Sequence, residues 1–109
     1  MENFKINAFR MQLKPGFELE YKKRHDEIWP ELSAALKAEG ISEYYIFLDE
    51  KTHALFAFQK LQTDETTANL PSLPIMKKWW DYMADIMDVN PDNSPVAVRF
   101  TEVFRMVAH

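Results

Sequence analysis

The chain has 109 residues, of which 47% are hydrophobic and 14% aromatic, a composition that suits one domain spanning residues 1–109 with a substantial core. Its 13 basic and 17 acidic residues give a formal charge of -4 with no basic block, which argues against nucleic-acid binding. The absence of cysteine excludes disulfides and thiolate chemistry, and without a signal-peptide pattern or an apolar run near the ~20 residues that span a bilayer we expect a cytoplasmic protein.

The first 40 residues predict a strand followed by helix. Residues Ile6–Lys14 mix apolar and polar side chains in the manner of a strand, and Pro15-Gly16 ends it. From Phe17 onward apolar residues recur at spacings of mostly three and four, which is typical of a helix that faces a core. Pro30 lies inside that pattern and predicts a kink or a second helical segment, and Gly40 predicts its end.

The middle of the chain predicts two strands joined by a hairpin. Ser42–Asp49 is apolar on both faces of a strand, residues 50–53 form the connection, and Ala54–Leu61 returns. Because side chains alternate across a strand, Tyr44 must face the side opposite Tyr45. Periodicity alone leaves open which of the two tyrosines faces the helices.

The last third of the chain predicts helix and a final strand. Thr63–Leu70 favours a short helix that the prolines at 71 and 74 interrupt, and Ile75–Met87 favours a longer one. Asn90–Pro95 is a cluster of turn residues, and Val96–Val107 reads as the last strand.

This βαββαβ order predicts an α+β, ferredoxin-like fold: an antiparallel sheet with helices on one face. The other face carries apolar side chains as well and would be exposed in a monomer. We therefore expect a homodimer that packs sheet against sheet, of the dimeric α/β-barrel type.

Tyr21 and His25 stand four residues apart in predicted helix, so their side chains share one face, one turn apart. An imidazole has an unperturbed pKa of roughly 6.5 and exchanges protons near neutral pH. A phenol one turn away suits a substrate contact, the orientation of the imidazole, or core packing. The pair leaves two interpretations open, a catalytic histidine in a cleft and an ordinary half-buried helix histidine.

Trp79 and Trp80 are adjacent in the second long helix, where neighbouring side chains point about 100° apart. If one ring packs on the sheet, the other lies at the edge of that packing. An indole there can stack on the apolar C–H face of a sugar and donate its N–H to a hydroxyl, although spacing alone favours two core anchors for the helix, since large aromatic stripes are normally core.

Metal chemistry is not favoured by the residue pattern. Asp26, Glu27 and Glu31 lie close to His25, but the basic residues Lys22–Arg24 beside them make a solvated charged face the better interpretation. The sequence has no paired-histidine motif, no glycine-rich phosphate loop and no Gly-x-Ser-x-Gly nucleophile. We expect no metal and no cofactor.

The sequence resembles the L-rhamnose mutarotase family over nearly its whole length. The blocks that carry the resemblance keep a common order and spacing: Tyr21-x-x-x-His25, Ile28-Trp-Pro-Glu-Leu32, Tyr44-x-Ile-x-Leu-Asp49, Leu55-Phe-Ala57, Trp79-Trp80-x-Tyr82-Met83 and Asn90-Pro-Asp-Asn-Ser-Pro-Val96. The resemblance implies a cytoplasmic, homodimeric isomerase that interconverts the α and β anomers of L-rhamnose without metal or cofactor.

The resemblance also implies roles for particular residues. His25 matches the family's proton donor, and its sugar-binding residues are matched by Tyr21, Tyr44, Trp79 and Trp80. The segment Glu65–Asn69 departs from the family pattern, which tends to carry a further tryptophan there, so L-fucose and L-lyxose are also candidate substrates.

Two other functional classes stay open on the residues alone. A cofactor-free monooxygenase of the same dimeric fold would need a larger, more apolar pocket and would consume oxygen. A non-catalytic ligand-binding module would bind a small molecule without accelerating any reaction.

Overall fold

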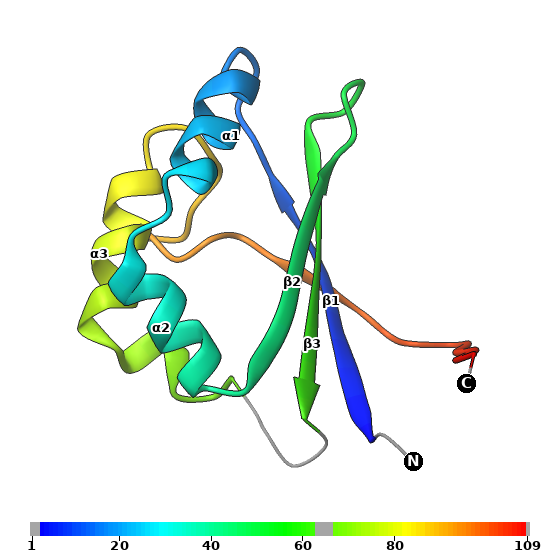
Figure 1. Cartoon of the computed structure of the whole chain (residues 1–109). Helices are drawn as coiled ribbons and strands as arrows, with labels where there is room; N and C mark the ends of the chain where they lie inside the picture. Colours follow the sequence, from blue (N-terminus) through cyan, green and yellow to red (C-terminus); the bar gives the residue numbers. More distant parts are fainter. Residues whose placement is uncertain (1–2, 63–66, 109) are drawn as a thin grey trace.

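A computed structural model describes residues 3–62 and 67–108 of the chain (Figure 1). The elements in chain order are β1 (Phe4–Gln12), α1 (Glu18–Asp26), α2 (Pro30–Ala38), β2 (Ile41–Leu48), β3 (Ala54–Gln62), a 3₁₀ turn (Leu70–Ser72), α3 (Pro74–Met83) and β4 (Val98–Phe100). The four strands form one antiparallel sheet in the order β2-β3-β1-β4, and the helices lie on one side of it. This arrangement confirms the predicted ferredoxin-like α+β fold.

The predicted long helix is two helices separated at the proline. Gly16 has φ +92° in the turn after β1, and α1 begins two residues later. Pro30 is the first residue of α2, a position where its missing N–H costs no hydrogen bond. Gly40 ends the second helix with φ +95°, a left-handed conformation that glycine adopts without strain. The break turns α2 away from α1 so that each helix packs on a different part of the sheet (Figure 1).

The predicted helix Ile75–Met87 is wrong in its last turn, because α3 ends at Met83. The next residues pair with the end of β1 instead: Lys14 donates to the Ile86 carbonyl at 2.9 Å, and Asp88 donates to the Gln12 carbonyl at 2.9 Å. Ile86 and Met87 are nevertheless buried. The helical spacing of apolar residues therefore predicted correctly that these two side chains are buried. It could not predict the backbone pairing that replaces the helix, because the partner residues lie far away in the sequence.

The predicted strand Val96–Val107 is also shorter than expected. Only Val98–Phe100 pairs with β1, and residues 101–108 form no strand. A strand requires a neighbouring backbone with which to form its ladder. Beyond Phe100 the chain leaves the sheet, and the link back to β1 is a side-chain contact in which Arg105 donates to the Phe4 carbonyl (Figure 1).

The predicted short helix Thr63–Leu70 lies partly outside the described residues. Its described part is wrong as a helix, because residues 67–69 form a turn that leads into the single 3₁₀ turn Leu70–Ser72. Leu70 is buried and packs against Ile41 and Leu61, so this segment closes one end of the helical layer. None of the helices in the described part of the chain is long and apolar enough to cross a membrane.

Side-chain alternation separates the two faces of the sheet as predicted. The face under the helices carries Leu55 and Ala57, which are buried. The opposite face carries Phe47 and Phe58, whose rings meet edge to face at 6.0 Å and are 60% and 36% exposed. Tyr45 shares that exposed face, which places Tyr44 on the helix side.

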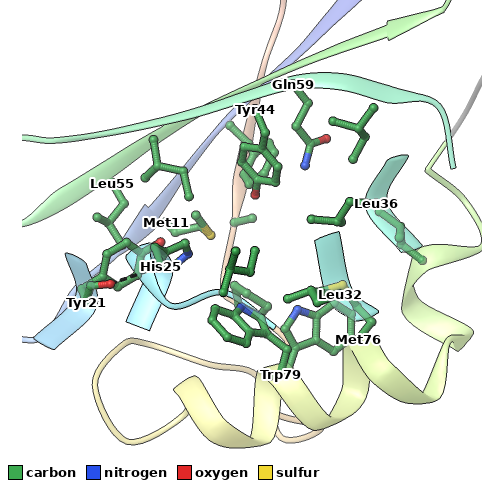
Figure 2. Close-up of a pocket in the computed structure, with 18 of the residues that line it drawn as sticks. Met11, Tyr21, His25, Leu32, Leu36, Tyr44, Leu55, Gln59, Met76 and Trp79 are labelled. Atoms are coloured by element: carbon green, nitrogen blue, oxygen red, sulfur yellow. Dashed lines mark hydrogen bonds between the residues drawn. The ribbon is translucent and has the colours of Figure 1, made fainter. Parts of the chain in front are cut away.

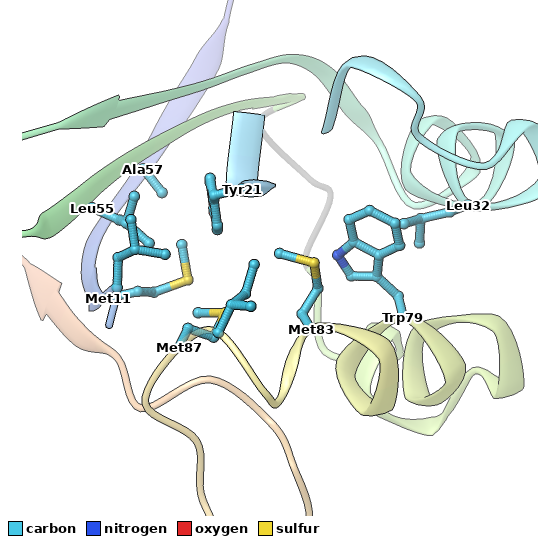
Figure 3. Close-up of a cluster of buried hydrophobic side chains, with 10 residues drawn as sticks. Met11, Tyr21, Leu32, Leu55, Ala57, Trp79, Met83 and Met87 are labelled. Carbon is cyan, nitrogen blue, oxygen red and sulfur yellow. The ribbon is translucent and has the colours of Figure 1, made fainter. Parts of the chain in front are cut away.

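The core lies between the helices and the covered face of the sheet (Figure 3). It combines aliphatic side chains from the strands with flexible methionines from α3 and the turn after it, which suit the irregular space at the junction of three helices. The buried members are Met11, Leu13, Tyr21, Leu32, Leu55, Ala57, Trp79, Met83, Ile86 and Met87.

Arg24 joins α1 to the end of α3. Its guanidinium pairs with Glu20 at 2.7 Å and Asp85 at 2.9 Å, and it donates to the Tyr82 carbonyl at 2.8 Å. The side chain is only 10% exposed, because it lies over the Tyr82 ring at 4.4 Å. The sequence interpretation of Lys22–Arg24 as a uniformly solvated charged face is therefore wrong for Arg24.

Replacing Arg24 with Met is expected to lower the free energy of unfolding by about 2 kcal/mol, because several charge-assisted hydrogen bonds are lost and the Tyr82 carbonyl loses its donor. Lys22→Met is the matched control: the Lys22–Asp26 pair is 73% and 61% exposed, and its loss should cost less than about 0.5 kcal/mol. Urea denaturation measures both. Equal effects of the two variants would contradict the role of Arg24.

Candidate functional site

A cavity of about 870 Å³ lies between the covered face of the sheet and the three helices. Its size is in the range of small-molecule pockets, roughly 300–1,000 Å³. All five residues proposed from the sequence line it, although they come from three different elements: Tyr21, His25, Tyr44, Trp79 and Trp80. The fold therefore brings together side chains that are up to 59 positions apart in the chain.

His25 is half-buried in the last turn of α1, where its ring faces the cavity (Figure 2). Its Nδ1 lies 3.0 Å from the Tyr21 carbonyl oxygen. A carbonyl oxygen only accepts, so Nδ1 carries the proton and donates. The Nε2 atom has no hydrogen-bond partner among residues 3–62 and 67–108. In the neutral ring Nε2 therefore presents a free lone pair.

The surroundings of His25 favour its neutral form. Burial lowers the pKa of His25 below its usual 6.5, and the hydrogen bond to the Tyr21 carbonyl and the nearby Asp26 charge oppose this only in part. The ring is held by neighbours: it stacks on Tyr21 at 4.3 Å and meets the Trp79 ring edge to face at 5.4 Å. The result is a fixed imidazole that is neutral at neutral pH, with the lone pair of Nε2 facing the cavity.

The two phenols remain protonated in this site. Burial raises the pKa of Tyr21, and the nearby Tyr44 phenol adds to the shift because two phenolates would repel. Burial also raises the pKa of Tyr44, and a polar interaction with Gln59 partly offsets this. Both phenols are therefore O–H donors and not bases at neutral pH.

The two tryptophans occupy different positions. Trp79 is 6% exposed and belongs to the core (Figure 3). Its ring meets Trp29 edge to face at 5.1 Å. Trp80 is only half-buried at the cavity wall. Trp79 thus supports the imidazole, and Trp80 has the more accessible ring for stacking on a ligand.

Sequence reasoning missed several polar residues of the cavity wall, among them Asn7 on β1 and Gln59 on β3. A signal for Gln59 existed, because it interrupts an alternating apolar face formed by Leu55, Ala57 and Leu61. Asn7 carried no such signal, since strand pairing brings it beside Gln59 across 52 positions.

No metal cluster is present in the described part of the chain, in which no three His, Cys, Asp or Glu side chains are grouped to hold an ion. Asp26 pairs with Lys22 at 2.9 Å. The segment Glu65–Asn69 lies partly outside the described residues, and Thr67 within it lines the cavity.

Comparison with known proteins gives a consistent result. The family model for L-rhamnose mutarotase matches residues 7–106. The L-rhamnose mutarotases of Bacteroides thetaiotaomicron and Flavobacterium johnsoniae are 56% and 55% identical to this chain, over 94% and 97% of it and 98% and 99% of their own lengths. The crystal structure of an L-rhamnose mutarotase from Formosa agariphila superposes with a TM-score of 0.86 at 55% identity, covering 94% of this chain and 98% of that one.

A more distant structure shares the fold alone. It is described as a candidate antibiotic biosynthesis monooxygenase from Bacteroides thetaiotaomicron and has 16% identity and a TM-score of 0.57, covering 98% of this chain and 96% of its own.

The lowered pKa of His25 predicts a pH dependence of stability. The unfolded chain binds a proton on His25 more readily than the folded chain. The free energy of unfolding therefore falls as the pH drops from 6.5 towards the folded-state pKa of His25. Below that pKa both states are protonated, so the effect of His25 on stability no longer changes with pH. Urea denaturation between about pH 7.5 and pH 5 measures the loss, and His25→Gln should show a shallower one. The same slope in both proteins would contradict the shift, as would an NMR titration of His25 with a midpoint above 6.5.

Proposed function

The chain belongs to the L-rhamnose mutarotase family, and we propose that it interconverts the α and β anomers of L-rhamnose by proton transfer through His25. It is an isomerase, since the reaction changes only the configuration at the anomeric carbon. The observation that carries the assignment of His25 is the position of its imidazole on the wall of a cavity large enough for a monosaccharide, with Nδ1 engaged by the Tyr21 carbonyl and Nε2 free.

The reaction requires two proton transfers and no redox change. The anomeric hydroxyl loses a proton, the ring oxygen gains one, and the bond between the anomeric carbon and the ring oxygen breaks to give an open-chain aldehyde. Rotation about the adjacent carbon–carbon bond presents the other face of the aldehyde. Reclosure reverses both proton transfers and gives the other anomer.

His25 suits both transfers. The anomeric oxygen and the ring oxygen are bonded to the same carbon, so one imidazole nitrogen reaches both. Neutral Nε2 takes the proton from the anomeric hydroxyl, and the resulting imidazolium gives it to the ring oxygen. Because burial disfavours the imidazolium, its proton is readily released. The Nδ1–H bond to the Tyr21 carbonyl holds the tautomer through the cycle.

The phenols and the indole position the sugar in this proposal. Tyr21 and Tyr44 keep their protons, which argues against a tyrosine base and favours donation to sugar hydroxyls. Trp80 supplies the stacking surface for the C–H face of the ring, and Trp79 holds the imidazole.

L-Rhamnose suits the apolar wall of the cavity. Leu36 and Met76 line it on the helix side, away from the polar side chains of the sheet (Figure 2). A 6-deoxy sugar carries a methyl group that such a wall accommodates without burying an unpaired hydroxyl. Among the alternatives, L-fucose shares this methyl group and L-lyxose lacks it. The cytoplasmic location implied by the family stays a prediction.

A homodimer is supported by the uncovered face of the sheet. This face is aromatic, with Tyr45, Phe47 and Phe100 exposed by 52%, 60% and 44%. The helices lie on the other side (Figure 1), so these side chains have no cover within the described chain. Packing against a second copy buries them, which is the usual fate of a large apolar patch.

His25→Ala is expected to slow enzymatic anomer exchange of L-rhamnose by ~10²–10⁴-fold, the usual contribution of a positioned proton-transfer group. Saturation-transfer NMR on the anomeric protons measures the rate, and the melting temperature verifies folding. His53→Asn is the matched control, because His53 pairs with Glu18 outside the proposed chemistry and its φ of +64° is tolerated by asparagine.

Unchanged exchange in folded His25→Ala would reject the assignment of His25. Wild-type protein that binds L-rhamnose without accelerating exchange would instead support the ligand-binding module, and oxygen consumption with an aromatic substrate would support the monooxygenase.

Phe47→Lys is expected to give particles with the mass of one chain where the wild type has the mass of two, because a charge on the aromatic face cannot be buried unpaired without a large cost. Light scattering coupled to gel filtration measures the mass. Leu19→Lys is the control, since Leu19 is 85% exposed on α1, away from that face. A wild-type mass of one chain, or a dimer that survives Phe47→Lys, would contradict this interface.

A further inference from the structure

Gln59 is a buried polar residue to which the proposed chemistry gives no task. It is 5% exposed and lies on the sheet wall of the cavity, and it is the single buried polar residue in the described part of the chain. A buried amide is costly unless its donors and acceptor are all engaged. The contacts of Gln59 therefore show which way each half of the amide points.

A chain of hydrogen bonds fixes the orientation of this amide. Asn7 Nδ2 donates to Gln59 Oε1 at 2.9 Å, and Arg99 Nη1 donates to Asn7 Oδ1 over a longer 3.4 Å. A guanidinium has no acceptor, so Arg99 can only donate. It holds the Asn7 oxygen towards itself and the Asn7 amide nitrogen towards Gln59. The Gln59 oxygen is thereby occupied, and its NH₂ group is directed away from Asn7.

The next group in this direction is the Tyr44 phenol. Tyr44 and Gln59 are paired across β2 and β3 and stand on the same face of the sheet. Figure 2 shows both side chains pointing into the cavity. Asn7 on β1 and Tyr44 on β2 flank Gln59 from opposite sides, so an amide nitrogen directed away from Asn7 is directed towards Tyr44. Burial raises the pKa of Tyr44, and the Gln59 side chain opposes this rise, which is the direction expected of an amide N–H near the phenol oxygen.

We propose that Gln59, oriented by Asn7 and Arg99, is a positioning residue that makes Tyr44 a hydrogen-bond donor to a hydroxyl of the sugar. The phenol oxygen accepts from the Gln59 amide, so the phenol O–H is directed into the cavity. A substrate must then offer a lone pair at that point, which makes the Arg99–Asn7–Gln59–Tyr44 chain a determinant of sugar specificity. This inference rests on the proposed mutarotase function.

Two substitutions of similar shape distinguish the direction of the hydrogen bond between residue 59 and Tyr44 from the packing of the side chain at position 59. Gln59→Glu keeps an acceptor for Asn7 but replaces the NH₂ group with a second acceptor, so the phenol O–H turns to the carboxylate and away from the sugar. Gln59→Met keeps the volume and removes both polar halves. Gln62→Met is the control, because Gln62 is exposed at the end of the same strand.

The experiment measures kcat and KM for anomer exchange of L-rhamnose, and Kd from tryptophan fluorescence, in these variants and in Tyr44→Phe. We expect Gln59→Glu and Gln59→Met to raise KM and Kd about tenfold with kcat within about twofold, and Gln62→Met to change neither. In the Tyr44→Phe background, Gln59→Met should have less than about a twofold further effect, because its action passes through the phenol.

A full tenfold effect of Gln59→Met in the Tyr44→Phe background would overturn the proposal, as would unchanged KM and Kd in both folded Gln59 variants. If the Gln59 variants fail to fold, Arg99→Met tests the same series of hydrogen bonds from its exposed end. We expect a two- to threefold rise in Kd for L-rhamnose. An unchanged Kd would contradict the proposal. The Kd measurement does not depend on turnover. If the wild-type protein does not accelerate anomer exchange, the proposed function fails, but the Kd values of the variants still test the role of Gln59.

Discussion

A strand has two faces, and one layer of helices covers only one of them. In this chain β1, β2 and β3 are apolar on both faces, so the placement of α1, α2 and α3 on one side decides which aromatic side chains become core and which become exposed surface. Tyr44 and Tyr45 are neighbours in sequence, yet one lines the cavity and the other is 52% exposed on the opposite face. The candidate site lies on the face of the sheet that the helices cover, and the proposed dimer interface lies on the face that they leave uncovered.

The helical layer does not fill the space above the sheet, and the cavity is where it leaves a gap. The break at Pro30 separates α1 from α2, and Arg24 holds α1 against the end of α3. Within that frame the His25 ring is fixed by the Tyr21 carbonyl and by the rings of Tyr21 and Trp79. A half-buried imidazole of this kind resists protonation, which suits a reaction that needs a proton accepted and promptly returned.

Polar groups in an apolar pocket define directions. The Tyr21 carbonyl sets which imidazole nitrogen carries the proton, and Arg99 sets the orientation of the Asn7 and Gln59 amides. The carbonyl can only accept a hydrogen bond and the guanidinium can only donate one. Each therefore fixes which atom of its neighbouring group is the donor and which is the acceptor. The proposed recognition of the sugar therefore depends on the fixed orientation of its donors as well as on the shape of the cavity.

Local pattern by itself determined much of this protein. The strand alternation that separates Leu55 and Ala57 from Phe47 and Phe58, the helix break at Pro30 and the four-residue step from Tyr21 to His25 are properties of neighbouring residues, so they are legible in the sequence. Only the tertiary structure decided that α3 ends at Met83, that β4 stops at Phe100 and that Asn7 meets Gln59, because each depends on backbone or side-chain partners more than 50 positions away. Periodicity records which side chains are buried, whereas a hydrogen bond between distant segments leaves no trace in the spacing of residues along the chain.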